Sequence, residues 1–314
     1  MSGSPTHGDL MPPRSDAEVP AYLEGLDLPG LADLHVHFHP DRLTQAIWAY
    51  FDRAEEHYGT PWPIHYRTSA RERLATLAQL GVHQVPALTY AHKPGMAAGL
   101  NAWCADLAAT HPQVLRCATL YPEPGMTEQI RAAVDEGLAL VKVHVTVSDL
   151  APDDDLLGGS WELLARARVP VVIHAGTGPR VRGRDTSHAG PEGVARLLAT
   201  HPDLTLVIAH LGLPEYEEFA DLAERYPRVH LDTTMAGTDF MERSAPVPPR
   251  FLGRLQELRS RVVLGSDFPN IPYPYAHQLE ALHRWGLGED WLRDVLWHNG
   301  RRLLAERVAR RRCG

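Results

Sequence analysis

Short apolar runs alternate along the chain with longer segments whose apolar residues recur at helical spacing. The short runs are rich in β-branched residues and are bounded by Gly, Pro or polar residues, which predicts strands. They cover residues 31–38, 82–90, 114–121, 139–147, 169–176, 204–212, 228–234 and 261–268. The helical patterns between them cover residues 70–81, 99–110, 126–137, 156–168, 192–202, 215–227 and 248–260. This alternation is typical of a parallel sheet covered by helices.

The spacing of the predicted strands favours a closed barrel. His37 in the first strand and Asp267 in the last are seven steps apart, with about 33 residues per step, and a (β/α)₈ TIM barrel of about 250 residues needs close to that spacing. A doubly wound sheet is the alternative, but no Gly-x-Gly-x-x-Gly follows the first strand. We therefore predict an α/β fold with one barrel domain and C-terminal helices over residues 31–314. Residues 1–30, rich in Pro, Ser and Gly, are expected to form a loose arm.

Composition and charge exclude some classes of protein. The formal net charge of −8 argues against a nucleic-acid binder, which would present a basic face. The first residues contain no apolar signal region, and no run of eighteen apolar residues follows, so we expect a cytoplasmic protein that does not bind membranes. The three cysteines, Cys104, Cys117 and Cys313, have no Cys-x-x-Cys spacing and fit unpaired thiols. The sequence leaves open whether the chain forms a homo-oligomer.

Histidines and carboxylates occur where the predicted strands end, which is where barrels of this type carry their active sites. His35 and His37 share one face of the first strand, because side chains alternate along a strand, and they can close on one metal ion. The later strands carry Lys142, His144, His174, His210, Asp232 and Asp267 at or near their ends. So many ligand types at equivalent points predict a metal site.

The motifs DLHVHFHP, VVIHAG, VIAHLG and LGSDFP resemble the metal-binding pattern of the amidohydrolase superfamily. They are most similar to the branch that contains aminocarboxymuconate-semialdehyde decarboxylase and related metal-dependent hydrolases. The resemblance extends from about Leu31 to Leu304. It implies an enzyme with a divalent metal, commonly zinc, and it assigns the ligands to His35, His37, His174 and Asp267. It further implies that His210 orients the metal-bound water or joins a second metal.

The implied chemistry gives each residue type a role. Bound zinc lowers the pKa of its water to about 7, so that hydroxide is available at neutral pH. Asp267 would accept the proton of that water and later deliver it to a leaving group. His210 would hydrogen-bond the nucleophile or polarise a carbonyl oxygen.

Lys142 decides how many metal ions the resemblance implies. In dinuclear members a carboxylated lysine on the fourth strand bridges two ions, and Lys142 lies on that strand. The alternative is that Lys142 is buried lower in the barrel and neutralises a carboxylate. His144 lies two residues closer to the end of the strand, and we expect it to be better placed to reach the site. We favour one ion, with zinc first and iron or manganese as alternatives.

Several further residues are weaker candidates for the surroundings of the metal and the substrate. His39 and Asp232 are candidates for hydrogen bonds to the ligand histidines; a solvated loop histidine and a buried polar cap are the alternatives. Arginine forks suit a substrate carboxylate, so a loop with Arg180, Arg182 and Arg184 is a candidate, although loop arginines are commonly solvated. Residues with weaker support at the same rim are Tyr90, His92 and Tyr121. Some aromatic residues of the stretch 46–67 are expected to pack in the core, and the others are expected to form a lid over the pocket. An aromatic lid indicates a substrate with an apolar or ring surface.

Three functions fit these residues. The first is a metal-dependent hydrolase that activates water for attack on an amide, ester or lactone carbonyl of a small substrate. The second is a non-oxidative decarboxylase, a carbon–carbon lyase, on the same metal site. The third is an iron-dependent oxygenase, because imidazole and carboxylate also suit iron.

Overall fold

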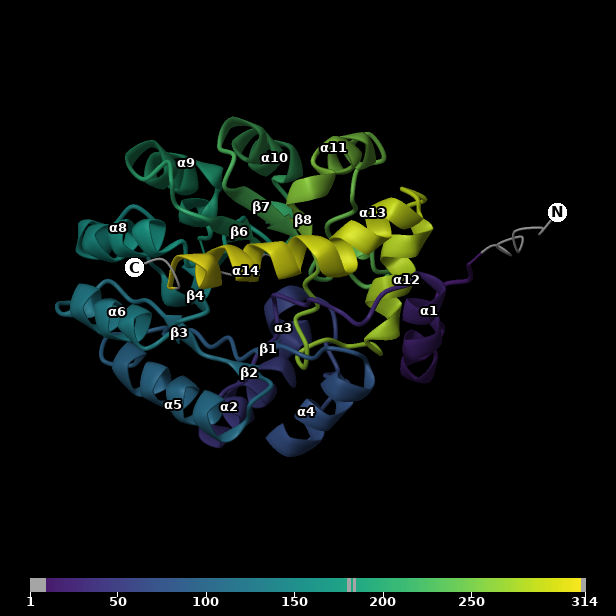
Figure 1. The fold of residues 1–314 in the computed structure, drawn as a ribbon, viewed down its shortest axis with the longest axis horizontal. Helices are drawn as coiled ribbons and strands as arrows, with labels where there is room; N and C mark the ends of the chain where they lie inside the picture. Colours follow the sequence, from purple (N-terminus) through teal and green to yellow (C-terminus); the bar gives the residue numbers. More distant parts are fainter. Residues whose placement is uncertain (1–9, 180–181, 183–184, 312–314) are drawn as a thin grey trace.

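The computed structural model describes residues 10–179, 182 and 185–311. Six parallel strands form one sheet in which each strand pairs with the next along the chain (Figure 1). They are β3 (Cys117–Thr119), β4 (Leu140–His144), β5 (Val171–His174), β6 (Leu206–Ile208), β7 (Val229–Asp232) and β8 (Val262–Val263). Strands β1 (Val85–Pro86) and β2 (Val114–Leu115) form a separate parallel pair. Sequential parallel pairing is the strand order of a TIM barrel.

The first predicted strand, residues 31–38, is extended but makes only isolated bridges. Val36 bridges to Phe268 beyond β8, and His37 bridges to Leu88 beyond β1. The ladder is interrupted because the N–H of His35 donates to the Asp33 side chain, at 3.0 Å, instead of to a neighbouring strand. The prediction of a regular strand is therefore wrong for this segment. Its bridges still connect the residues after β8 with those after β1. The segment therefore lies between β8 and β1, where a barrel needs a strand.

Helices lie outside the strands, as Figure 1 shows. Each of the seven predicted helical segments contains a helix, and this prediction is confirmed. These helices are α4 (Ala70–Gln79), α5 (Ala97–Thr110), α6 (Met126–Asp135), α8 (Gly158–Ala167), α9 (Pro191–Thr200), α10 (Tyr216–Arg225) and α11 (Phe251–Glu257). The others are α1 (Val19–Gly25), α2 (Asp41–Phe51), α3 (Ala54–Tyr58), α7 (Val145–Ser148), α12 (Ala276–Arg284), α13 (Glu289–Arg293) and α14 (Asn299–Arg311). In the described ranges, no helix has the length and apolar character that a membrane span requires.

An apolar layer fills the sheet interior just below the predicted site. It is a single buried cluster that contains Leu34, Leu88, Leu140, Val172, Val207, Val263 and Leu303. Each of the strand residues in it precedes a predicted site residue by one to four positions, whereas Leu303 comes from α14, which crosses the strands in Figure 1. Helix α14 therefore covers the amino ends of the strands, and the carboxyl ends remain for the polar side chains.

The amino-terminal segment differs from the loose arm predicted for residues 1–30. Residues Val19, Tyr22, Leu23 and Leu26 are buried in the main core, and α1 forms around them. Their spacing of three, four and seven residues is that of an amphipathic helix, so burial of this face offsets the Pro and Gly content that suggested a coil. Residues 1–9 lie outside the described part of the chain.

Candidate metal centre

Three donor atoms from two segments meet at the carboxyl ends of the strands. The Nε2 atoms of His35 and His37 are 3.2 Å apart, and the Oδ1 atom of Asp267 lies 3.4 Å and 3.0 Å from them, respectively. Ligand atoms about 2.0–2.1 Å from a tetrahedral ion are about 3.3 Å from one another. The separations therefore fit one ion between the three side chains.

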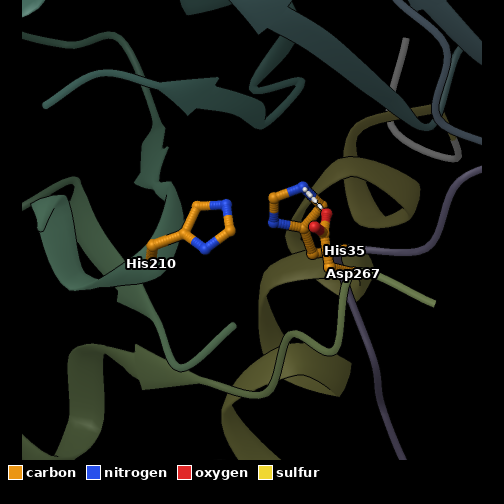
Figure 2. Close-up of side chains that lie close together, drawn as sticks. All are labelled: His35, His210 and Asp267. Atoms are coloured by element: carbon orange, nitrogen blue, oxygen red, sulfur yellow. Dashed lines mark ion pairs between the residues drawn. The ribbon is translucent and has the colours of Figure 1, made fainter. Parts of the chain in front are cut away.

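His210 approaches the same point from the end of β6. Donor atoms of His35, His210 and Asp267 all lie within 4.8 Å of one another, and Figure 2 shows the imidazole of His210 facing that of His35. Two or three imidazoles with one carboxylate form a donor set that suits a divalent ion and leaves room for a further ligand.

Hydrogen bonds fix the orientation of the candidate ligand rings. The Nδ1 atom of His37 is 3.1 Å from the carbonyl oxygen of Leu88, and the Nδ1 atom of His210 is 3.1 Å from that of Thr234. A carbonyl oxygen only accepts, so both rings carry their proton on Nδ1. The lone pair on each Nε2 is therefore free for a metal ion, which is the arrangement that outer hydrogen bonds produce at known metal sites.

Burial sets the protonation of these groups. Burial, reinforced by the charge of Lys142, lowers the pKa of His35 to about 3, and burial also lowers the pKa of His210. Burial raises the pKa of Asp267, but its contact with His37 and the neighbouring imidazoles outweigh this and hold the pKa well below its usual value. Neutral imidazoles and an ionised carboxylate therefore coexist at neutral pH, and these are the forms that bind a metal.

Asp232 at the end of β7 connects two of the candidate ligands. Its Oδ2 atom lies 2.9 Å from Nδ1 of His35, while its Oδ1 atom accepts hydrogen bonds from the backbone N–H groups of His210, at 2.8 Å, and Thr234, at 3.0 Å. Burial raises its pKa, but the contact with His35 outweighs this and lowers the pKa to about 2. One ionised carboxylate thus orients the ring of His35 and fixes the backbone of His210, which matches the place predicted for Asp232 next to a ligand.

Replacing Asp232 by asparagine is expected to weaken metal binding by about 10- to 100-fold, the cost typical of losing such a partner. The amide cannot supply the negative charge that faces Nδ1 of His35. The measurement is a competition titration of metal-free protein against a chelator. Asp221→Asn is the control, because Asp221 forms an exposed ion pair with Arg254 on the outer face of α10. Equal affinity in the Asp232 and Asp221 variants would contradict this role.

Two of the site residues have left-handed backbone conformations. His210 has φ 55°, its neighbour Leu211 has φ 55°, and Asp267 has φ 67°. Left-handed conformations strain residues other than glycine, although Asn, Asp and His adopt them more readily than most. Such strain persists only where surrounding contacts impose it, and it is concentrated at functional sites. No sequence pattern indicated it.

The rings of His174 and His144 lie beside His210. Their rings stack with centroids 4.0 Å apart, and the ring of His174 lies 4.5 Å from that of His210. The Nε2 atom of His174 is 3.4 Å from the carbonyl oxygen of Gly178. His35, His210 and Asp267 form a group of donors within 4.8 Å of one another, and His174 is not part of that group. The role of His174 as a ligand therefore stays a prediction.

Lys142 reaches the cluster directly. Its Nζ atom is 2.8 Å from Nε2 of His35, and burial lowers its pKa to about 8. The expectation that His144 is better placed is wrong, because the long lysine stem spans the extra distance while the shorter His144 side chain packs on His174. Within the described part of the chain Lys142 forms no ion pair at contact distance, but the charges of Asp232 and Asp267 oppose the lowering of its pKa. The alternative in which Lys142 neutralises a carboxylate therefore stays a prediction. The Nε2 lone pair of His35 can either accept a hydrogen bond from Lys142 or bind a metal ion. These two interactions therefore exclude each other.

His39 and Tyr90 lie beside the candidate ligands. The ring of His39 is parallel to that of His37 at 5.6 Å, and its Nδ1 atom is 2.8 Å from the hydroxyl of Thr89. The ring of Tyr90 meets His37, His39 and His144 edge-on at 5.1–5.7 Å. Both residues are therefore adjacent to the cluster and not in the solvated loop that was the alternative for His39.

The other predicted rim residues have no described contact with the candidate ligands or lie outside the described residues. His92 is exposed and Tyr121 is half-buried, and no described contact joins either of them to the cluster. Arg180 and Arg184 lie outside the described residues. Arg182 is exposed, and its backbone N–H donates to the carbonyl oxygen of His57 at 2.8 Å, which places this point of the loop against α3.

The aromatic stretch of residues 46–67 is largely part of the packing around the site. Trp62 is buried and its Nε1–H donates to the carbonyl oxygen of Asn270 at 2.8 Å. Tyr66 is buried against Phe268, with ring centroids 4.6 Å apart. These contacts support the segment that follows Asp267.

Sequence reasoning missed two hydroxyl groups at the site. The Oγ1 atom of Thr234 is 3.0 Å from Nδ1 of His35, and the hydroxyl of Ser266 donates to Asp33 at 2.5 Å. Their positions next to Asp232 and Asp267 were the only available signal, because serine and threonine carry no distinctive spacing.

Comparison with known structures gives several similar barrels. An uncharacterized TIM-barrel protein from Bordetella bronchiseptica has a TM-score of 0.68 at 21% identity and covers 87% of this chain and 98% of its own. 5-Carboxyvanillate decarboxylase from Novosphingobium aromaticivorans, complexed with manganese, has a TM-score of 0.58 at 14% identity and covers 96% of this chain and 100% of its own. A putative 2-pyrone-4,6-dicarboxylic acid hydrolase from Pseudomonas putida has a TM-score of 0.56 at 16% identity and covers 87% of this chain and 96% of its own. These similarities show the shared fold.

No curated protein matches the chain. The family model described as amidohydrolase matches residues 32–305, which include all the candidate ligands. With the histidine–carboxylate cluster, this match supports a divalent metal at the site. The predicted fold class, family and enzymatic nature are thereby confirmed: the chain belongs to the amidohydrolase family and is an enzyme.

Proposed function

We propose that the protein is a metal-dependent hydrolase that activates water for attack on an amide, ester or lactone carbonyl of a small substrate. The observation that supports this most directly is the convergence of His35 Nε2, His37 Nε2 and Asp267 Oδ1 at separations of 3.0–3.4 Å. A divalent ion held there, zinc in this proposal, supplies a Lewis acid and lowers the pKa of the water it binds.

The chain's own residues supply the proton transfers. Asp267 is ionised and its side chain is partly exposed, so it accepts a proton from the attacking water and returns it to the leaving group. The Nδ1–H of His210 donates to the carbonyl oxygen of Thr234. The unprotonated Nε2 is therefore a hydrogen-bond acceptor. Of the two roles implied for His210, this tautomer favours orienting the nucleophile over donating to a carbonyl oxygen.

Non-oxidative decarboxylation is the second candidate for the same centre. The observation in its favour is the similarity to 5-carboxyvanillate decarboxylase over 96% of this chain. The rings of Tyr90, His144 and His174 along one wall suit a flat, ring-containing substrate in either reaction. Iron-dependent oxygenation would require redox-active iron in the purified enzyme, so metal analysis separates it from the other two.

Removal of the metal is expected to abolish turnover. The purified protein is analysed for metal, dialysed against a chelator, and tested on ring-containing lactones, esters, amides and carboxylic acids before and after addition of one equivalent of Zn²⁺ or Mn²⁺. Activity should fall below about 1% of that of the loaded enzyme, since water activation depends on the ion, and it should return with the metal. Carboxylic acid formation supports hydrolysis, whereas CO₂ release supports decarboxylation. Full turnover by metal-free protein would overturn both.

A further inference from the structure

A segment that precedes the family-matched residues is bonded to the start of α12. Asp16 lies in a short 3₁₀ helix (Asp16–Glu18), before the matched range of 32–305. Its Oδ1 atom accepts the backbone N–H of Ala276, the first residue of α12, at 2.9 Å, and its Oδ2 atom accepts the hydroxyl of Tyr66. The first N–H groups of a helix have no partner within the helix, and a carboxylate there is favourable. Asp16 therefore acts as a cap for α12, although it is about 260 positions away.

A chain of buried hydrogen bonds continues from this cap to the metal centre. The hydroxyl of Tyr66 accepts the N–H of Tyr275 at 2.6 Å, and the hydroxyl of Tyr275 donates to Oδ2 of Asp33 at 2.8 Å. Oδ2 of Asp33 also accepts the hydroxyl of Ser266, and its Oδ1 accepts the N–H of His35 at 3.0 Å. Tyr275, Asp33 and Ser266 are all fully buried. Water does not compete for these bonds, so each one constrains its neighbours.

The chain of bonds holds both ends of the segment between Asp267 and α12. At one end, Ser266 precedes the candidate ligand Asp267 and is fixed to Asp33. At the other end, Tyr275 and Ala276 are fixed by Tyr66 and Asp16. Asp267 has a left-handed backbone, so its position depends on how the adjoining segment is held.

We propose that Asp16 and Tyr66 are positioning residues for the metal centre. They hold the segment 268–275 so that the carboxylate of Asp267 meets the imidazoles of His35 and His37. This inference rests on the metal centre of the proposed function. The amino-terminal segment thus takes part in the site, although it lies outside the family match.

The variants Asp16→Asn and Tyr66→Phe test this, and Tyr22→Phe is the matched control. The hydroxyl of Tyr22, in the same amino-terminal segment, is 3.0 Å from Nδ1 of His283 near the other end of α12. Its loss removes one bond between the same two parts of the chain without touching Tyr275 or Asp33. Zn²⁺ and Mn²⁺ are each titrated into metal-free full-length protein, and the unfolding midpoint of each metal-free variant is recorded.

All three variants are expected to unfold at a lower temperature when metal-free, but only Asp16→Asn and Tyr66→Phe should bind both ions about 3- to 10-fold more weakly. This loss is smaller than the about 10- to 100-fold typical of direct partners of the ligands, because both residues act through intervening bonds. Tyr22→Phe should bind within twofold of the unchanged protein. A purely structural role would lower the midpoints and leave all affinities equal, which would overturn the inference. If the unchanged protein binds neither ion, the proposed function fails instead.

A second measurement needs no variant. Coupling between the segment and the metal is reciprocal, so the ion must also strengthen the contacts of Asp16 and Tyr66. In the unchanged protein, Zn²⁺ is expected to slow hydrogen exchange of the amides of Tyr275 and Ala276 by about 3- to 10-fold, while the amide of Gly253 in α11 is unaffected. Equal exchange with and without the ion would overturn the inference even if a variant fails to fold.

Discussion

Replacing Asp267 by asparagine is expected to reduce kcat/KM by at least about 10³-fold, within the range that loss of a general acid–base group produces. Asparagine fills the same space and is one of the few residues that adopt a left-handed backbone, so the conformation at φ 67° is preserved. The amide cannot accept a proton from water and is a weaker metal ligand than the carboxylate. The measurements are steady-state kinetics with the substrate identified from the panel, and metal content after gel filtration.

The control for this variant is Asp239→Asn, because Asp239 forms an exposed ion pair with Arg284 and no described contact joins it to the candidate ligands. We expect this change to leave kcat/KM within twofold. If the Asp267 variant keeps both its metal and its turnover, neither the proposed ligand set nor the assigned proton transfer is correct.

Replacing Gly265 by alanine is expected to damage the metal centre and the fold together. An added Cβ would lie 2.2 Å from Oγ1 of Thr234, 2.9 Å from Cβ of His35 and 3.0 Å from Cγ of Asp232. All three neighbours are buried and hydrogen-bonded to one another, so none moves without disturbing the others. Overpacking of this kind destabilises by about 1–3 kcal/mol. We also expect metal affinity to fall more than tenfold, since the displaced groups include one candidate ligand and the carboxylate that orients it.

Calorimetry and metal titration check this result, and Gly253→Ala is the control. Nothing lies within 4 Å of a Cβ added at Gly253, which is in helix α11. Alanine is favoured over glycine in a helix by up to about 1 kcal/mol, so this variant should be unchanged or slightly more stable. Wild-type stability and affinity in the Gly265 variant would mean that the close packing behind His35 is not required.

Much of the site was accessible from sequence because strand periodicity and barrel geometry are local rules. The pattern His35-x-His37 and the strand-end positions of His210 and Asp267 sufficed to predict that these side chains meet. The roles of Lys142 and His144 were not accessible in the same way. Which of two residues on one strand reaches a point depends on the length and direction of each side chain among its neighbours.

The amino-terminal segment gives a second example. Its Pro, Ser and Gly content suggested a loose arm, whereas Val19, Tyr22 and Leu23 form the buried face of α1 and Leu26 extends that face beyond the end of the helix. Local composition describes only the preference of the isolated chain. The burial of that face depends on the core against which it packs.

The sequence by itself determined the parallel α/β architecture, the family, and the histidine and carboxylate side chains available to a metal, because each follows from local periodicity and motif. Only the tertiary structure decided the tautomers of His37 and His210, the left-handed backbone of Asp267, and the connection from Asp16 to the metal centre. These features arise from hydrogen bonds between segments up to about 260 residues apart, and no local pattern specifies such partners.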